Sequence, residues 1–224
     1  MVNNNSFSCF VETNSYLWCI QKLIMTDLFN FQTEGFIKKT DKLEPKGKSI
    51  SKEEKSELKK TTRDDNAMNI LKDVGGFPTT KNYLAIKTNG TSDAGSFFNC
   101  ALKVFGEVEE MYLATWTISK SNVNRLRDEV GSGKLKKLVM VISSTLKPAN
   151  PALYAYLIGK LNEFENVEIK EVNSHAKTFS MKCGDNFFTI SGSANWSENP
   201  RIENFLILND RDLYEHHAEW MDEL

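Results

Sequence analysis

Leu138-Val139-Met140-Val141-Ile142 is an unbroken apolar run, and it is the stretch that best indicates the fold of this chain. Runs of this kind form strands that are covered on both faces of a sheet. Strand-like apolar segments also occupy residues 83–86 and 111–118 upstream. Downstream, Asn150 is followed by Pro151, a pair that marks the start of a helix. Strands and helices therefore alternate around this run.

Two further helices are predicted between the strands. Ser92 or Asp93 can cap the first and Ser121 the second, because short polar side chains accept hydrogen bonds from the free N–H groups at a helix start. The apolar residues of each helix recur at helical spacing. The alternation predicts an α/β fold, with helices flanking the sheet. The apolar positions are Phe97, Phe98, Ala101, Val104 and Phe105 in the first helix, Val123, Leu126 and Val130 in the second, and Leu153, Leu157, Leu161 and Phe164 after Pro151.

The composition is that of an ordinary globular protein, with 224 residues, 40% hydrophobic and 26% charged, and a net charge of −2. The four cysteines show no C-x-x-C spacing and no histidine partners, which predicts free thiols in a reducing compartment and argues against a structural metal. No apolar run approaches the roughly 18 residues that span a bilayer. No basic segment precedes the apolar residues 16–25, so we expect a cytoplasmic protein without a signal peptide.

Residues 1–80 differ from the rest of the chain and are predicted to be an N-terminal extension, followed by one domain over residues 81–224. The Lys/Glu-rich run 49–73 predicts a helix that stops at Gly75-Gly76. Residues 36–63 hold ten Lys and Arg against five Asp and Glu. This basic excess fits either an arm for an acidic partner such as nucleic acid or, more simply, a solvated helix with mixed charges.

After the last helix the pattern becomes all-β, with strands expected over 167–172, 177–182 and 187–191. A three-residue turn at Gly184-Asp185-Asn186, with Asn186 in a positive-φ conformation, would join the last two strands. That register places His175 opposite Asn195 and Lys177 opposite Ser193, and strand alternation then projects all four side chains from one face. A two-residue turn would shift the register by one residue and separate the pairs.

The residue types in this segment suit chemistry on a phosphodiester. Lys177 supplies a point charge for non-bridging phosphate oxygens, and His175 can act as a nucleophile or as a general acid. Glu203 can hold a histidine ring by its other nitrogen. This arrangement needs no metal ion.

The H-x-K, G-S-x-N and acid pattern formed by His175, Lys177, Ser193, Asn195 and Glu203 resembles the phospholipase D superfamily, in particular its small nucleases with one motif per chain. The resemblance covers roughly residues 81–208 and implies a phospholipase D-like domain with a mixed β-sheet flanked by helices. It also implies catalysis through a phosphohistidine without a cofactor or metal. By position, it makes His175 the nucleophile or acid, makes Lys177 and Asn195 the phosphate ligands, and gives Ser193 and Glu203 the roles of supporting donor and histidine orienter.

Because the chain has one H-x-K, the resemblance further implies a homodimer whose active site lies on the two-fold axis. The expected substrate is nucleic acid, DNA or RNA, cleaved by an endonuclease; the expected partners include no membrane. The family pattern has Asp where this chain has Lys182. Two alternatives remain open: a catalytically inactive nucleic-acid-binding member of the fold, and a phospholipid phosphodiesterase.

Other aromatic and histidine residues fit simpler roles. His216 and His217 suit an amphipathic C-terminal helix better than a metal site. Trp116 and Trp196 flank the expected site and could stack on a base. Core packing is the favoured role for Trp116, and the sequence leaves the role of Trp196 open.

Overall fold

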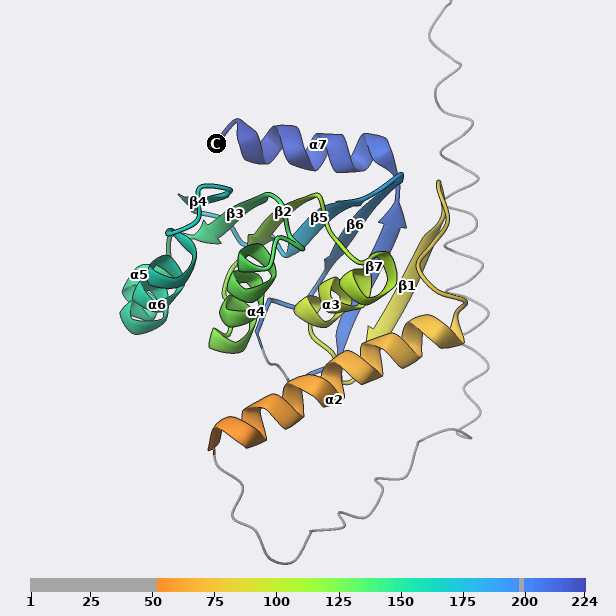
Figure 1. Ribbon diagram of the computed structural model, residues 1–224, viewed down its shortest axis with the longest axis horizontal. Coiled ribbons are helices and arrows are strands. Elements are labelled where there is room, and N and C mark those ends of the chain that lie inside the picture. The colour runs from red at the N-terminus through yellow and green to blue at the C-terminus, as the bar shows by residue number, and fades with distance from the viewer. Residues whose placement is uncertain (1–51, 198–199) are drawn as a thin grey trace, which may run out of the picture. The chain divides into compact units, whose positions relative to one another are not determined.

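The computed structural model describes residues 52–197 and 200–224, with the side chains of 52–57 left aside (Figure 1). These described residues form one compact unit. The start of the expected N-terminal extension, including most of its basic run, lies outside the described residues. None of the helices in the described segments is long and apolar enough to cross a membrane.

The centre of the fold is a seven-stranded mixed sheet in the order β1-β7-β6-β5-β2-β3-β4. Strands β2, β3 and β4 run parallel to one another, and the other neighbours are antiparallel. The predicted α/β class with a mixed sheet between helices is confirmed. The strands are β1 (Tyr83–Thr88), β2 (Glu110–Thr115), β3 (Leu138–Ser143), β4 (Val167–Val172), β5 (Thr178–Cys183), β6 (Asn186–Gly192) and β7 (Glu203–Asn209).

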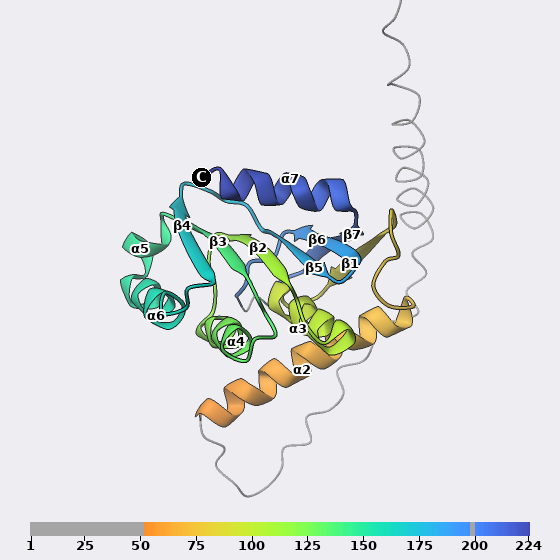
Figure 2. The same cartoon turned by 45° about the horizontal axis from the view of Figure 1, so that its top comes forward.

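Helices cover both faces of this sheet (Figures 1 and 2). One face packs against α3 (Ala94–Phe105), α4 (Lys120–Gly131) and α6 (Pro151–Leu161), the last preceded by the short α5 (Leu146–Ala149). The opposite face carries α7 (Arg211–Asp222), which packs over β2, β3, β5 and β6. The apolar run that predicted a doubly covered strand is β3, and all of its residues are buried.

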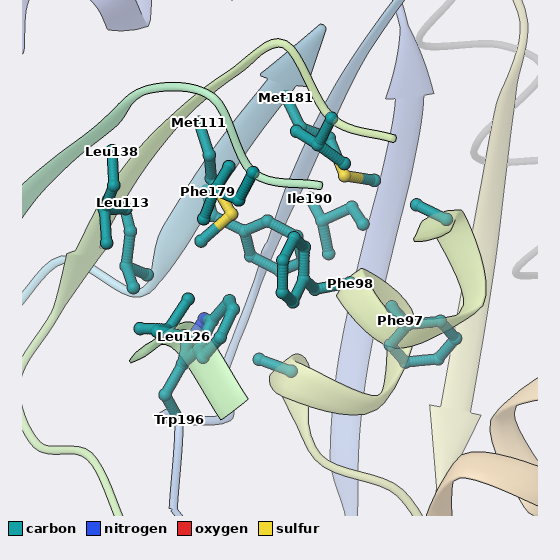
Figure 3. Packing of buried hydrophobic residues seen from close by; sticks show 14 of the residues in the cluster. Phe97, Phe98, Met111, Leu113, Leu126, Leu138, Phe179, Met181, Ile190 and Trp196 are labelled. Carbon is teal, nitrogen blue, oxygen red and sulfur yellow. The ribbon is translucent and has the colours of Figure 1, made fainter. Parts of the chain in front are cut away.

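The main core lies between the sheet and the α3–α4 layer (Figure 3). Phe98 and Phe179 pack on Trp196, with ring centroids 5.8 and 5.1 Å from the indole. Trp196 is 2% exposed and bridges to Ile118. Burying a side chain of this size contributes a few kcal/mol. The residue that follows Asn195 in the chain is therefore a core anchor.

Helix α2 (Lys52–Asp73) packs against α3 and contributes Ala67 and Leu71 to the main core. It is also fastened by a buried ion pair, in which Arg125 of α4 donates to both carboxylate oxygens of Asp64 at 2.9 and 2.8 Å. Leaving either charge unpaired in the core would cost about 3–5 kcal/mol. The helix expected in the extension is thus integrated into the compact unit, while the division at residue 80 stays a prediction.

Two of the three expected helix starts are confirmed, and one is wrong by two residues. Asp93 caps α3 by accepting from the Ser96 N–H, and Asn150 caps α6 in the same way. For α4 the cap is Ser119, which accepts from the Asn122 N–H, and not Ser121. The hydroxyl of Ser121 instead pairs with that of Ser119 at 2.8 Å.

The hairpin of β5 and β6 has a two-residue loop, so the predicted three-residue turn and its register are wrong. Cys183 pairs with Asn186, and the positive φ of 59° falls on Gly184 rather than on Asn186. Glycine at the first loop position suits a type II′ turn, whose twist matches that of the strands. The paired residues of β5 and β6 end at Thr178 and Ser191, so His175, Lys177, Ser193 and Asn195 lie beyond the paired part of the hairpin.

Candidate active site

The expected site residues lie together at one edge of the sheet because of the strand directions. Strands β2 and β3 end there, β5 begins there after the loop from β4, β6 ends there and β7 begins there. In α/β sheets this edge, beyond the carboxyl ends of the parallel strands, is the usual place for ligands. His175 and Lys177 precede β5, Ser193 and Asn195 follow β6, and Glu203 is the first residue of β7.

His175 and Lys177 are in direct contact. The Nζ atom of Lys177 lies 3.1 Å from Nδ1 of the imidazole and donates to the His175 carbonyl oxygen at 3.2 Å. The intervening Ala176 N–H donates to the Ser174 hydroxyl, which holds the loop. His175 is exposed and Lys177 is half-buried. A cation and an imidazole are therefore presented side by side to solvent.

The environment of Lys177 favours its neutral form more than water does. Burial lowers the pKa of its ammonium below the usual lysine value, although the charge of Glu203 acts in the opposite direction. Desolvation disfavours any charged group that lacks a strong counter-ion. A bound phosphate would supply that counter-ion.

Ser193 and Glu203 form a hydrogen-bonded pair across the β6–β7 edge. The hydroxyl of Ser193 donates to Oε2 of Glu203 and accepts from the Asn204 N–H at 3.1 Å. Glu203 is only 6% exposed. The roles of Ser193 as a supporting donor and of Glu203 toward a histidine both stay predictions.

Gly192 allows β6 and β7 to meet closely next to this pair. A Cβ atom at this position would lie 2.1 Å from the carbonyl oxygen of Asn204. The N–H of Ser193 donates to that same oxygen at 3.1 Å. The glycine of the G-S-x-N motif is thus required by the backbone that positions the serine, a role that the motif spacing alone did not indicate.

Asn195 lies between two buried residues, Ala194 and Trp196. The backbone of Trp196 is held by the Thr115 hydroxyl, which accepts from its N–H at 3.3 Å, and by Asn122, which donates to its carbonyl oxygen at 3.0 Å. The side-chain oxygen of Asn195 is buried and has no hydrogen-bond partner. Unpaired buried acceptors cost about 1–3 kcal/mol and are rare in folded proteins. Asn195 thus keeps an unused acceptor at the site.

The core role favoured for Trp116 is wrong, and Trp196, whose role the sequence left open, is buried. Trp196 is the core residue, whereas Trp116, directly after β2, is 41% exposed. The indole Nε1 of Trp116 donates to the Thr145 hydroxyl at 2.9 Å, and its ring centroid lies 5.5 Å from that of His175. The sequence placed Trp116 inside a strand over 111–118, whereas β2 ends at Thr115, so the exposure of this residue was missed.

Three other residues considered from the sequence lie away from this edge. Lys182, which stands where the family pattern has Asp, is at the far end of β5 and pairs with Glu109 at 2.5 Å. His216 and His217 are on α7, which follows the opposite end of β7 from Glu203. Burial and the neighbouring His216 lower the pKa of His217. The amphipathic helix expected for these histidines is present.

His175 and Trp116 are exposed at this edge of the sheet. A small pocket lined by Lys177, Gly192 and Ala194 among others measures about 10 Å³, which is no more than one water molecule needs. Within residues 52–197 and 200–224, no group of three or more His, Cys, Asp or Glu side chains could hold a metal ion. The functional groups offered at this edge are therefore one imidazole, one ammonium, a hydroxyl–carboxylate pair and an amide.

Comparisons with known proteins give weak likenesses. No protein-family model and no curated protein matches the sequence. A polyphosphate kinase from Porphyromonas gingivalis is 14% identical with a TM-score of 0.46, and the match covers 63% of this chain and 26% of the kinase chain. A phosphatidylserine synthase from Haemophilus influenzae Rd KW20 is 13% identical with a TM-score of 0.43, covering 79% of this chain and 47% of the synthase.

A third solved structure is TrmBL2, an archaeal chromatin protein described as showing a novel mode of DNA binding. It is 11% identical with a TM-score of 0.40, and the match covers 100% of this chain and 73% of that chain. Because all three identities and TM-scores are low, the function is argued below from the residues of the site.

Proposed function

We propose that this protein is a metal-independent phosphodiesterase of the phospholipase D type that cleaves nucleic acid through a phosphohistidine. The observation that carries this proposal is the contact between His175 and Lys177 at the open sheet edge. A nucleophilic ring and a phosphate-binding cation are the two groups that such a reaction needs in the same place. The nearby Ser193–Glu203 pair supports the same reading.

The proposed reaction has two displacements at phosphorus. A ring nitrogen of His175 attacks the phosphorus, the P–O bond to the leaving group breaks, and the leaving oxygen takes a proton from a second imidazole. Water then attacks the phosphohistidine, giving its proton to that second imidazole, and the P–N bond breaks to free His175. Lys177 and Asn195 hold the non-bridging oxygens during both steps.

The second imidazole is proposed to be His175 of another copy of the chain. The sequence has three histidines, and the other two lie on α7 beyond the opposite end of β7. A two-fold axis through the site would bring two copies of His175 together, as symmetric dimers do with any residue near the axis.

Cleavage that depends on two chains can be tested by mixing wild-type protein with an equimolar amount of the His175→Ala variant. With free exchange of subunits, about a quarter of the dimers keep both histidines, so activity per wild-type chain is expected to fall by about half. Activity is measured on single-stranded DNA and plasmid in EDTA. Activity per wild-type chain that stays unchanged in the mixture, or a fully active monomer in light scattering, would contradict the shared site.

A pH effect on binding follows from Lys177. Because burial lowers the pKa of its ammonium, we expect the charge that binds phosphate to be lost at a lower pH than for an ordinary lysine. The affinity for an oligonucleotide is measured between pH 7.5 and 10.5 with a His175→Gln variant, which does not cleave it. This affinity should fall at a lower pH than expected for a site with an ordinary lysine. Adding Lys177→Arg should remove the decline, since arginine stays charged throughout this range.

The binding module without turnover is separated from the enzyme by these same experiments. The wild-type protein could bind the oligonucleotide through Lys177 and yet cleave nothing, either in EDTA or with divalent cations. That result would reject the enzyme and favour the inactive nucleic-acid-binding protein.

A further inference from the structure

We propose that Trp116 is the surface on which the base next to the cleaved phosphate stacks, so that the substrate is single-stranded nucleic acid with an unstacked base at this position. This inference deepens the proposed function and rests on it. It starts from an exposed indole that contacts the ring of His175.

Trp116 is anchored by a hydrogen bond although it is exposed. Its Nε1 donates to the Thr145 hydroxyl at 2.9 Å, and that hydroxyl is in turn 2.9 Å from the hydroxyl of Ser143. Ser143 is the last residue of β3 and Thr145 follows it by two residues, and β3 lies beside β2, which Trp116 directly follows. A large aromatic fixed in this way loses little entropy when a ligand binds to its free face.

The position of Trp116 matches the geometry of a nucleotide. Its ring centroid lies 5.5 Å from that of His175, with the planes inclined at 52°. In a nucleotide the base is joined to its phosphate through a single sugar, so a phosphate at His175 and Lys177 carries its base into the neighbourhood of this ring. A lipid headgroup or an inorganic polyphosphate has no flat ring to place there.

One stacking face favours a single strand over a duplex. A base within a duplex is already stacked on both faces, and extruding it costs a few kcal/mol. An unpaired base stacks on an aromatic side chain at no such cost, and stacking of this kind changes affinity by about 5- to 100-fold. We therefore expect the wild-type protein to prefer single-stranded over double-stranded substrate.

The test compares two oligomers of equal length, an oligo(dT) and one in which every residue is an abasic tetrahydrofuran. The wild-type protein is expected to cleave the oligo(dT) with about 5- to 100-fold higher kcat/KM. Trp116→Leu should lose this preference, because its kcat/KM falls further on the oligo(dT) than on the abasic oligomer, and Trp116→Phe should retain most of the preference. A Thr145→Val variant, which releases the indole, should show an intermediate preference.

Two results would overturn the stacking while leaving the phosphodiesterase in place. The first is an unchanged preference in Trp116→Leu. The second is an equal loss of rate on both oligomers in that variant, because Trp116 would then only position the imidazole of His175.

A fluorescence titration tests stacking on Trp116 independently of cleavage. If the protein cleaves neither oligomer, the proposed enzyme is refuted, but the titration still tests the stacking. Oligo(dT) should quench the tryptophan emission of the His175→Gln variant, and the abasic oligomer should not. Trp116→Phe in that background should remove the quenching, whereas Trp220→Phe, on the opposite face of the sheet, should leave it. Quenching that persists without Trp116 contradicts the proposal.

Discussion

Replacing His175 by alanine is expected to lower phosphodiester cleavage by at least about a thousandfold, because the variant has neither the nucleophile nor, in the partner chain, the proton donor. Removing the covalent nucleophile of a hydrolase commonly lowers the rate by about three to six orders of magnitude. The measurement is single-turnover cleavage of a labelled single-stranded oligonucleotide in EDTA.

The matched control is His216→Ala. Both histidines are exposed, but His216 lies on α7, away from the site edge. We expect full activity in the control and an unchanged thermal midpoint in both variants, since exposed side chains contribute little to stability. Cleavage by His175→Ala within about tenfold of the wild-type rate would remove this histidine from the chemistry.

Gly192→Ala, which adds one methyl group, is expected to lower both the stability and the activity of the protein. The added Cβ would lie 2.1 Å from the carbonyl oxygen of Asn204, so β6 and β7 must separate. That movement breaks the hydrogen bond from the Ser193 N–H to the same oxygen. We expect a loss of about 3 kcal/mol or more in the free energy of unfolding, and a fall of about 6–12 °C in the thermal midpoint.

Activity should fall in Gly192→Ala even at temperatures where the protein stays folded, because Ser193 moves away from Glu203. Gly159→Ala is the control: its Cβ meets nothing within 4 Å, and alanine in place of glycine in the last turn of α6 favours the helix by up to about 1 kcal/mol. A Gly192→Ala protein with wild-type stability and rate would show that the strands do not need this close approach.

The fold class was predictable because hydrophobic patterning reports burial directly. The run that became β3 is apolar throughout and is covered on both faces. Asp93 and Asn150 were recognisable as caps because their side chains act locally. The order of strands was not predictable, since β7 inserts between β1 and β6 through contacts distant in sequence.

The site was predictable as a set of residues but not as a geometry. The motif identified His175, Lys177, Ser193, Asn195 and Glu203, and all five lie at one sheet edge. The register failed because a loop of two residues and one of three are both compatible with Gly184-Asp185-Asn186, and Gly184 takes the positive φ. The core role favoured for Trp116 failed because β2 ends at Thr115 and leaves the tryptophan in the segment that follows.

The most direct test of the central claim, covalent catalysis by His175, is the stereochemical course at phosphorus. Cleavage of a phosphorothioate diester of known configuration in ¹⁸O-labelled water distinguishes one displacement from two. Each in-line displacement inverts the phosphorus, so a phosphohistidine pathway predicts net retention of configuration. Net inversion would mean that water attacks the diester directly, and it would contradict a nucleophilic role for His175.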